Sequence, residues 1–535
     1  MIRIVKPINM HYNYKALSRA AVFFSLIILS TSCKDESNDY VAIAPPVVFT
    51  PNLPIDVDPV LQKALKDIGD IYQLNEAFNL YSWQALVAIN WPQNSEGQPQ
   101  PEFTDEGDPA WINWKEAFQV YRADGKTPAP WDSPRTNTGL GIDNAAISDS
   151  SARLVLSNTS ATNMSNINIA NETEQAFAGE LFDQNGNVVV YEVLMNKEEF
   201  DYVVENKLYN VNGQLEFVKT NPVANFPKGD YQKNIVGATE IKLAWKILGE
   251  NDIKERYFVD EGYIVTDSIE SAQPVPLGLI GIHISQKTPT GKQWVWSTFE
   301  HIDNLEQNTT ERFGEKTIIH PTLTDPECEI CPVNIDVSKN NTTYTFNTGE
   351  HGDYWTISGD KTGKYYADEP VMKTQSKRMV DIPVRVKTIN ELMRDYFVQE
   401  GSVWQYYQLI DTQYPLDQDA APAMSTASEY HIPESVVNKP GGNPNLTFLT
   451  NISMETFFQK GNQIAGLMEN SQSDMTIFGT ESCMGCHSSA YLYTSYDAEN
   501  NSFVPGTQLS GDFSWLLKSA KWEQGIPKPS AQDNQ

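Results

Sequence analysis

Residues 277–300 read LGLIGIHISQKTPTGKQWVWSTFE. Two runs rich in β-branched and aromatic residues, 277–286 and 293–299, flank the segment Thr288-Pro289-Thr290-Gly291. Pro and Gly favour a turn, while the flanking residues favour strands, so the pattern predicts an antiparallel hairpin. The hairpin places antiparallel β-structure at the centre of the chain.

The sequence around this hairpin predicts further strands and helices. Strand signals, with Ile, Val, Tyr and Trp, are found at 188–191, 240–248 and 256–266, and helical periodicity at 58–91 and 389–398. We therefore expect an α+β fold with a largely antiparallel β central body, N-terminal helices and a small helical C-terminal module. The mixed α+β body is expected over 61–440 and the C-terminal module over 441–535.

Residues 1–32 predict an export signal rather than part of the fold. Lys15 and Arg19 precede an apolar run, 20–29, that is too short to span a bilayer, and small residues then lead to Cys33. The pattern resembles a bacterial lipoprotein signal peptide, in which Cys33 becomes the lipidated first residue of the mature chain. An ordinary cleaved secretory signal with an incidental cysteine is the alternative.

Residues 33–60 predict a lipid anchor at Cys33 followed by a tether. The tether is expected because a Pro-rich segment is unsuited to forming a packed core. Acidic residues close behind Cys33 resemble the surface-export signals of some bacterial lipoproteins. We therefore expect an outer membrane lipoprotein, on the cell surface or the periplasmic face. The membrane contact is expected through the lipid anchor only.

The chain is strongly acidic, with a formal net charge of −30 at pH 7. This charge opposes binding to nucleic acid, so no nucleic-acid partner is expected. It favours protein partners with a basic docking face. The alternative is that the acidity only keeps an exported protein soluble.

Four cysteines besides Cys33 form two C-x-x-C pairs, and only the second pair is followed by histidine, as Cys483, Cys486 and His487. Two thiols at this spacing fall on one side of a helical turn, where they can add to the two vinyl groups of haem. The adjacent histidine can then bind the iron. The motif predicts one covalent haem c, with His487 as an axial ligand.

Other uses of these cysteines remain open. Together with Cys328 and Cys331, the second pair could form a four-thiolate zinc site, although such sites are less expected in an exported protein. Cys483 and Cys486 could also form a short disulfide. Cys328 and Cys331 lie between prolines and lack a following histidine, so we expect them to close a small loop as a disulfide; a redox-active dithiol is the alternative.

The sixth position of the iron is left open by the motif. No Met or His follows His487, so a protein ligand there must come from upstream, and the haem segment is expected to be integrated with the larger body. His301 is the favoured candidate, because Glu300, His301 and Asp303 follow a hydrophobic strand. A strand-end histidine bonded to its own loop is the structural alternative. The other candidates are Met454, Met468, Met475, His283, His320, His351 and His431.

Three stretches, 81–92, 296–301 and 482–487, taken together resemble a group of large bacterial cytochrome c family proteins. The resemblance implies haem c and export, and supplies no substrate. We expect electron transfer to or from a redox partner protein. The alternatives are a haem-dependent oxidoreductase, peroxidase-like or a small-substrate dehydrogenase, with its substrate site in the large N-terminal body, and a surface binding protein in which haem is a sensor or a structural element. No catalytic residue is assigned.

Overall fold

The computed structural model describes residues 49–134, 155–157, 180–265, 274–291, 293–327, 333–334, 344–347, 353–357, 365–367, 373–378, 381–415, 450–458, 483, 487, 490–507 and 509–530. Several predicted sites lie outside these residues: Cys33, Cys328, Cys331, Cys486, Met468, Met475, His351 and His431. None of the described helices is long and apolar enough to cross a membrane.

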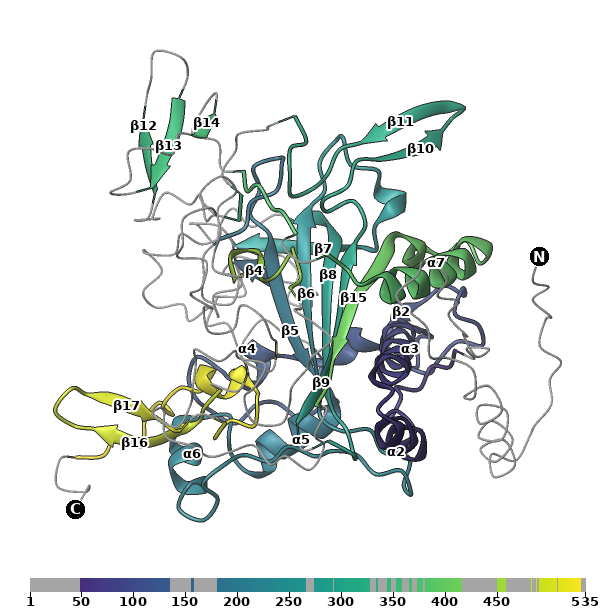
Figure 1. Ribbon diagram of the computed structural model, residues 1–535. Coiled ribbons are helices and arrows are strands. Elements are labelled where there is room, and N and C mark those ends of the chain that lie inside the picture. The colour runs from purple at the N-terminus through teal and green to yellow at the C-terminus, as the bar shows by residue number, and fades with distance from the viewer. Residues whose placement is uncertain are drawn as a thin grey trace.

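The described residues form an α+β fold around an eight-stranded, mostly antiparallel sheet (Figure 1). Its main strand order is β15-β9-β8-β6-β5-β3; β7 pairs with the first half of β8, and β4 runs parallel to β7. The predicted α+β class and antiparallel body are confirmed. The strands are β3 (Lys115–Glu116), β4 (Val155–Ser157), β5 (Val190–Met195), β6 (Thr239–Ile247), β7 (Val259–Val265), β8 (Pro274–Lys287), β9 (Trp294–His301) and β15 (Tyr407–Gln413).

The predicted central hairpin is formed by β8 and β9, which pair from Gly281 opposite Glu300 to Lys287 opposite Trp294. Successive side chains of a strand point to opposite faces of the sheet. The even-numbered residues of β9 therefore share one face and the odd-numbered residues share the other. This parity decides which β9 side chains can meet the C-terminal part of the chain.

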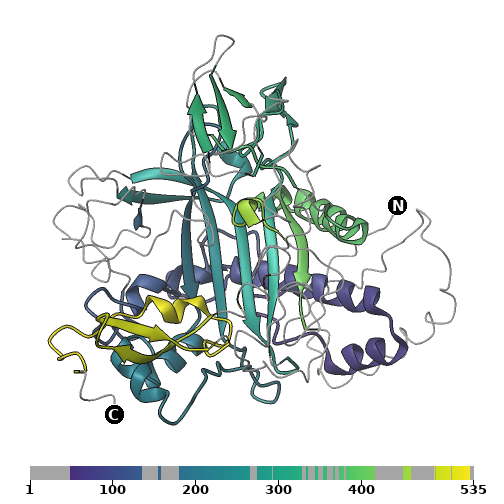
Figure 2. The ribbon, with the colours of Figure 1, turned by 60° about the vertical axis from the view of Figure 1, so that its left-hand side comes forward.

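One face of the sheet, here called the helical face, is covered by α3 (Ile71–Ile89) and α7 (Val384–Gln399). Figure 2 shows α3 crossing the strands at a steep angle. The fully buried Trp83 of α3 meets Phe299 of β9 with ring centroids 5.0 Å apart. Large side chains from helices and strands thus form the principal core on this side.

The helical region predicted over 58–91 is divided into α2 (Pro59–Ile68) and α3. The side chain of Asp58 accepts hydrogen bonds from the first turn of α2, and Gly69, with φ of 75°, ends it. A left-handed residue at this position is favourable for glycine, which has no β-carbon. The side chain of Asp70 then caps α3 by accepting from Gln73 N.

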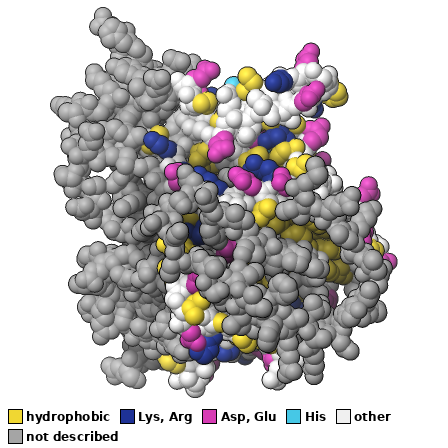
Figure 3. Space-filling model, turned by 45° about the vertical axis from the view of Figure 1, so that its right-hand side comes forward, with side chains coloured by type: hydrophobic (Ala, Val, Ile, Leu, Met, Phe, Trp, Pro, Cys, Tyr) yellow, Lys and Arg dark blue, Asp and Glu magenta, His cyan; other side chains and the backbone are white. Residues whose placement is uncertain are grey.

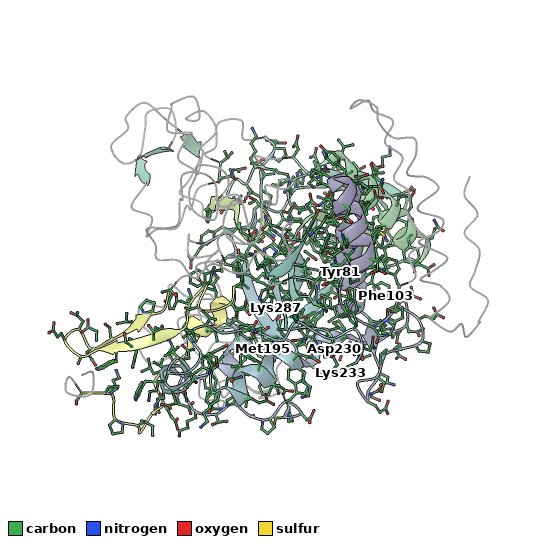
Figure 4. All side chains as sticks on the ribbon, turned by 60° about the horizontal axis from the view of Figure 1, so that its bottom comes forward. Tyr81, Phe103, Met195, Asp230, Lys233 and Lys287 are labelled. Atoms are coloured by element: carbon green, nitrogen blue, oxygen red, sulfur yellow. The ribbon has the colours of Figure 1, made fainter. Side chains whose placement is uncertain are left out.

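The opposite face, here called the C-terminal face, is covered by residues 450–458 and 509–517. Residues 450–458 lie close to β8 because Gly281 has no side chain; a β-carbon there would overlap Ser453 Oγ. Glu300 of β9 accepts from Ile452 N and pairs with Arg378. Figure 4 labels Tyr81 on α3 and Lys287 at the end of β8.

The described C-terminal residues depart from the predicted small helical module. It contains an antiparallel hairpin of β16 (Tyr493–Asp497) and β17 (Ser502–Pro505), followed by a 3-10 helix, η13 (Trp515–Ser519). The buried Gln214 of α6 (Val211–Phe217) donates to Leu517 O at 2.9 Å and accepts from Tyr493 N at 2.8 Å. These contacts tie the described C-terminal residues to the body.

Smaller elements complete the described fold. On the part of the surface seen in Figure 3, charged side chains of both signs are interspersed with apolar ones. The remaining helices and strands are β1 (Pro92–Gln93), β2 (Asp108–Pro109), η1 (Ala110–Asn113), α4 (Ala117–Val120), α5 (Lys197–Glu205), η4 (Lys254–Arg256), β10 (Asn308–Arg312), β11 (Glu315–Ile319), β12 (Tyr344–Asn347), β13 (Asp353–Ile357), β14 (Tyr365–Ala367), η6 (Val403–Tyr406) and η10 (Thr456–Phe458).

Candidate haem-binding site

Two of the three residues of the C-x-x-C-H motif, Cys483 and His487, lie within the described residues. Both positions are helical and they are four residues apart, so their side chains share one side of a helical turn. Cys483 is half-buried and packs against the two largest hydrophobic clusters of the body. Cys483 is therefore held against the protein core.

The ring of His487 is fixed by a hydrogen bond to the C-terminal segment. Its Nδ1 donates to Phe513 O at 2.7 Å, and the ring lies 5.6 Å from the ring of Trp296 on β9. Since a carbonyl oxygen can only accept, the proton is on Nδ1 and the lone pair of the neutral ring is on Nε2. Metal-binding histidines have this arrangement, in which a second hydrogen bond fixes the tautomer.

The surroundings of His487 keep its ring neutral. Burial lowers the pKa of His487 to about 4, and electrostatic interactions with His283 and Lys242 act in the same direction. The hydrogen bond to Phe513 and the carboxylate of Glu455 oppose this shift in the pKa. A neutral imidazole is the form that binds a metal, so the residues present suit an axial ligand of haem iron.

A second histidine lies on the C-terminal face, in a row formed by Thr298, His283 and Lys242 on neighbouring strands. His283 Nδ1 is 2.9 Å from Thr298 Oγ1, and its Nε2 is 2.7 Å from Glu455 Oε1. Although burial raises the pKa of Glu455, its interactions with His283 lower the pKa overall. The pair joins the sheet to residues 450–458.

The structure argues against the favoured prediction that His301 is the sixth ligand. His301 has odd parity and points to the face opposite Trp296, which contacts His487. Both of its ring nitrogens bond to backbone groups: Nε2 lies 2.9 Å from Arg256 O, and Nδ1 accepts from Asp303 N at 3.1 Å. The ring stacks on Tyr257 at 4.3 Å. The strand-end histidine has a structural role.

Met454 also lacks the surroundings expected for a ligand of this haem. It is fully buried in a hydrophobic cluster with Tyr191, Ile280 and Phe457. Cys483 packs against other clusters. Met454 therefore fills the core beneath residues 450–458.

Two buried carboxyl groups lie close to the candidate site. Glu240 of β6 shares a row of the sheet with Ser285 and Trp296, and its neighbour Glu199 comes from α5. Glu199 is fully buried, and burial together with the charge of Glu240 raises its pKa well above the usual value. Ser514 donates to Glu240. The folded pair therefore retains a proton that unfolded glutamates would release.

Replacing Glu199 with glutamine should stabilise the protein increasingly as the pH rises. The pKa of Glu199 is higher in the folded protein than in the unfolded chain, where it is about 4.3. As the pH rises between these two values, the free energy of unfolding of the wild type therefore falls by about 1.4 kcal/mol per pH unit. The glutamine amide, which does not titrate, can donate to Glu240. Urea unfolding of both proteins at pH 5 and pH 8 measures the difference in their free energies of unfolding. The same difference at both pH values would contradict the prediction.

Within the described residues, no group of three or more His, Cys, Asp or Glu side chains is arranged to hold a metal ion. Comparison of the chain with family models, with curated proteins and with solved structures found no match.

Proposed function

We propose that the protein is an exported, lipid-anchored c-type cytochrome that carries one covalent haem and transfers electrons to or from a partner protein. Cys483 and Cys486 would attach the haem, and His487 would bind its iron. The observation that carries the proposal is the orientation of His487 within a C-x-x-C-H motif: its Nδ1 donates to Phe513 O, which leaves Nε2 for a metal.

The bound haem would supply one-electron chemistry, and the protein residues would hold it in place. The carbonyl of Phe513 fixes the imidazole tautomer of His487. Trp296 and Phe513, whose rings lie 5.6 Å apart, form an apolar wall beside the histidine. A haem-bearing C-terminal region within 441–535 that packs onto the α+β body agrees with these contacts.

The charge and N-terminal sequence support the remaining parts of the proposal. A net charge of −30 favours a redox partner with a basic docking face. Lipidation at Cys33 would hold the protein on the outer membrane. Both features suit a protein that exchanges electrons at the cell envelope.

Removal of both motif thiols should abolish covalent haem attachment. The double variant Cys483→Ala, Cys486→Ala is expected to lose the haem that remains with the polypeptide under denaturing conditions, because both thioether bonds require cysteine sulfur. Haem staining of denaturing gels and the intact mass of protein matured in a host with cytochrome assembly measure this.

A matched control replaces the other C-x-x-C pair. The variant Cys328→Ala, Cys331→Ala should retain covalent haem, because that pair has no following histidine. Wild-type protein with the mass of polypeptide and lipid alone would contradict the proposed function.

A further inference from the structure

We infer that His283 is the sixth ligand of the haem iron, which would make the cofactor a six-coordinate, bis-histidine haem suited to electron transfer. The inference rests on the proposed function, since it assumes covalent haem at His487. It also narrows the proposed function to electron transfer, because an iron with protein ligands at both axial positions has no open site for a substrate.

The sheet register places His283 beside the contact between His487 and the body. His283 lies directly opposite Thr298, and Trp296 is two residues further along β9 on the same face. Such diagonal neighbours are about 7–8 Å apart. Since Trp296 contacts His487 directly, the two histidines lie on the same face of the sheet and in the same neighbourhood.

His283 has hydrogen-bond partners that suit a change to iron ligation. Thr298 Oγ1, 2.9 Å from Nδ1, can accept a hydrogen bond from that nitrogen. Nε2 could then offer its lone pair to the iron once Glu455 Oε1, which lies 2.7 Å from it, has turned away. The carboxylate of Glu455 can remain bound to Asn451 N, which donates to its other oxygen at 3.0 Å.

Other candidate ligands among the described residues are placed less favourably. His301 is five residues from Trp296, about 17 Å along the strand, and on the opposite face. Met454 is enclosed in an apolar cluster, and His320 is exposed beyond β11. Of these three residues and His283, only His283 lies on the same face of the sheet as the contact between Trp296 and His487, and close to it.

The absorption and electron paramagnetic resonance spectra of the purified haem protein test this assignment. Wild-type ferric protein should be low-spin, and the reduced protein should leave carbon monoxide unbound. His283→Ala should make the ferric haem high-spin and allow the reduced protein to bind carbon monoxide. His283→Met should stay six-coordinate with a raised midpoint potential, because methionine ligation favours the ferrous state.

One control variant accompanies these measurements. His320→Ala, at an exposed histidine, should leave every spectrum unchanged. A high-spin wild-type protein would overturn the assignment. A low-spin spectrum that neither His283 variant changes would also overturn it, and would point to Met468 or Met475 as the ligand. If His283→Ala fails to fold, an unchanged spectrum and potential in His283→Met alone would overturn it. Absence of covalent haem in the wild type would instead refute the proposed function.

Discussion

Replacing Asp512 with alanine is expected to lower the free energy of unfolding by about 3–5 kcal/mol. Asp512 pairs with Lys287 of β8, and the side chains of the two residues are only 4% and 3% exposed. Asp512 Oδ2 also accepts from Phe226 N at 2.7 Å. The substitution leaves an ammonium group buried without its counter-charge, and it removes a tie between the C-terminal segment and the sheet.

Urea unfolding of the alanine variant measures this loss. The double variant Lys287→Met, Asp512→Leu should recover much of the stability, because replacing a buried ion pair with apolar side chains is often neutral or stabilising. Asp67→Ala is the matched control, since Asp67 pairs with Lys63 on the exposed surface of α2, where ion pairs contribute only about 0–1 kcal/mol. Equal losses in Asp512→Ala and Asp67→Ala would contradict the prediction.

Replacing Trp83 with alanine is expected to cost about 3–5 kcal/mol, through the lost burial of the indole and the cavity left behind. Trp83 is fully buried between α3 and the sheet, 5.0 Å from the ring of Phe299 and 5.8 Å from that of Phe397. Because these neighbours belong to β9 and α7, the change loosens the packing of both elements on α3. A lowered urea midpoint with little change in slope would show the loss.

The variant Trp83→Phe provides the comparison for this prediction. It keeps an aromatic ring and removes an indole N–H that has no hydrogen-bond partner among the described residues. Its loss should therefore be much smaller than that of Trp83→Ala. A similar loss of stability in both variants would contradict this prediction.

Local signals in the sequence were sufficient to predict much of the fold. The Thr288–Gly291 turn between two apolar runs predicted the β8–β9 hairpin, because turn and strands are neighbours in the chain. The order of the strands in the sheet could not be predicted, since it depends on pairings between residues far apart, such as Tyr407 with His301. The division at Gly69 was missed because apolar residues recur on both sides of it.

The candidate site was predictable only where it is local. Cys483, Cys486 and His487 form one continuous motif, whereas the surroundings of His487 come from β6, β8, β9 and two C-terminal segments. The prediction of His301 relied on its polar neighbours in the sequence. Strand parity places His301 and Trp296 on opposite faces of the sheet. The contact between Trp296 and His487, which joins distant parts of the chain, could not be predicted from the sequence.

The hydrogen bond between His487 and Phe513 has a consequence for the order of events during biogenesis. The two residues are 26 positions apart, and the β16–β17 hairpin lies between them. If the protein is exported as proposed, the imidazole can take its final orientation only after residue 513 has been translocated. In the proposed cytochrome, an enzyme that attaches the cofactor earlier would meet a motif whose histidine still rotates freely.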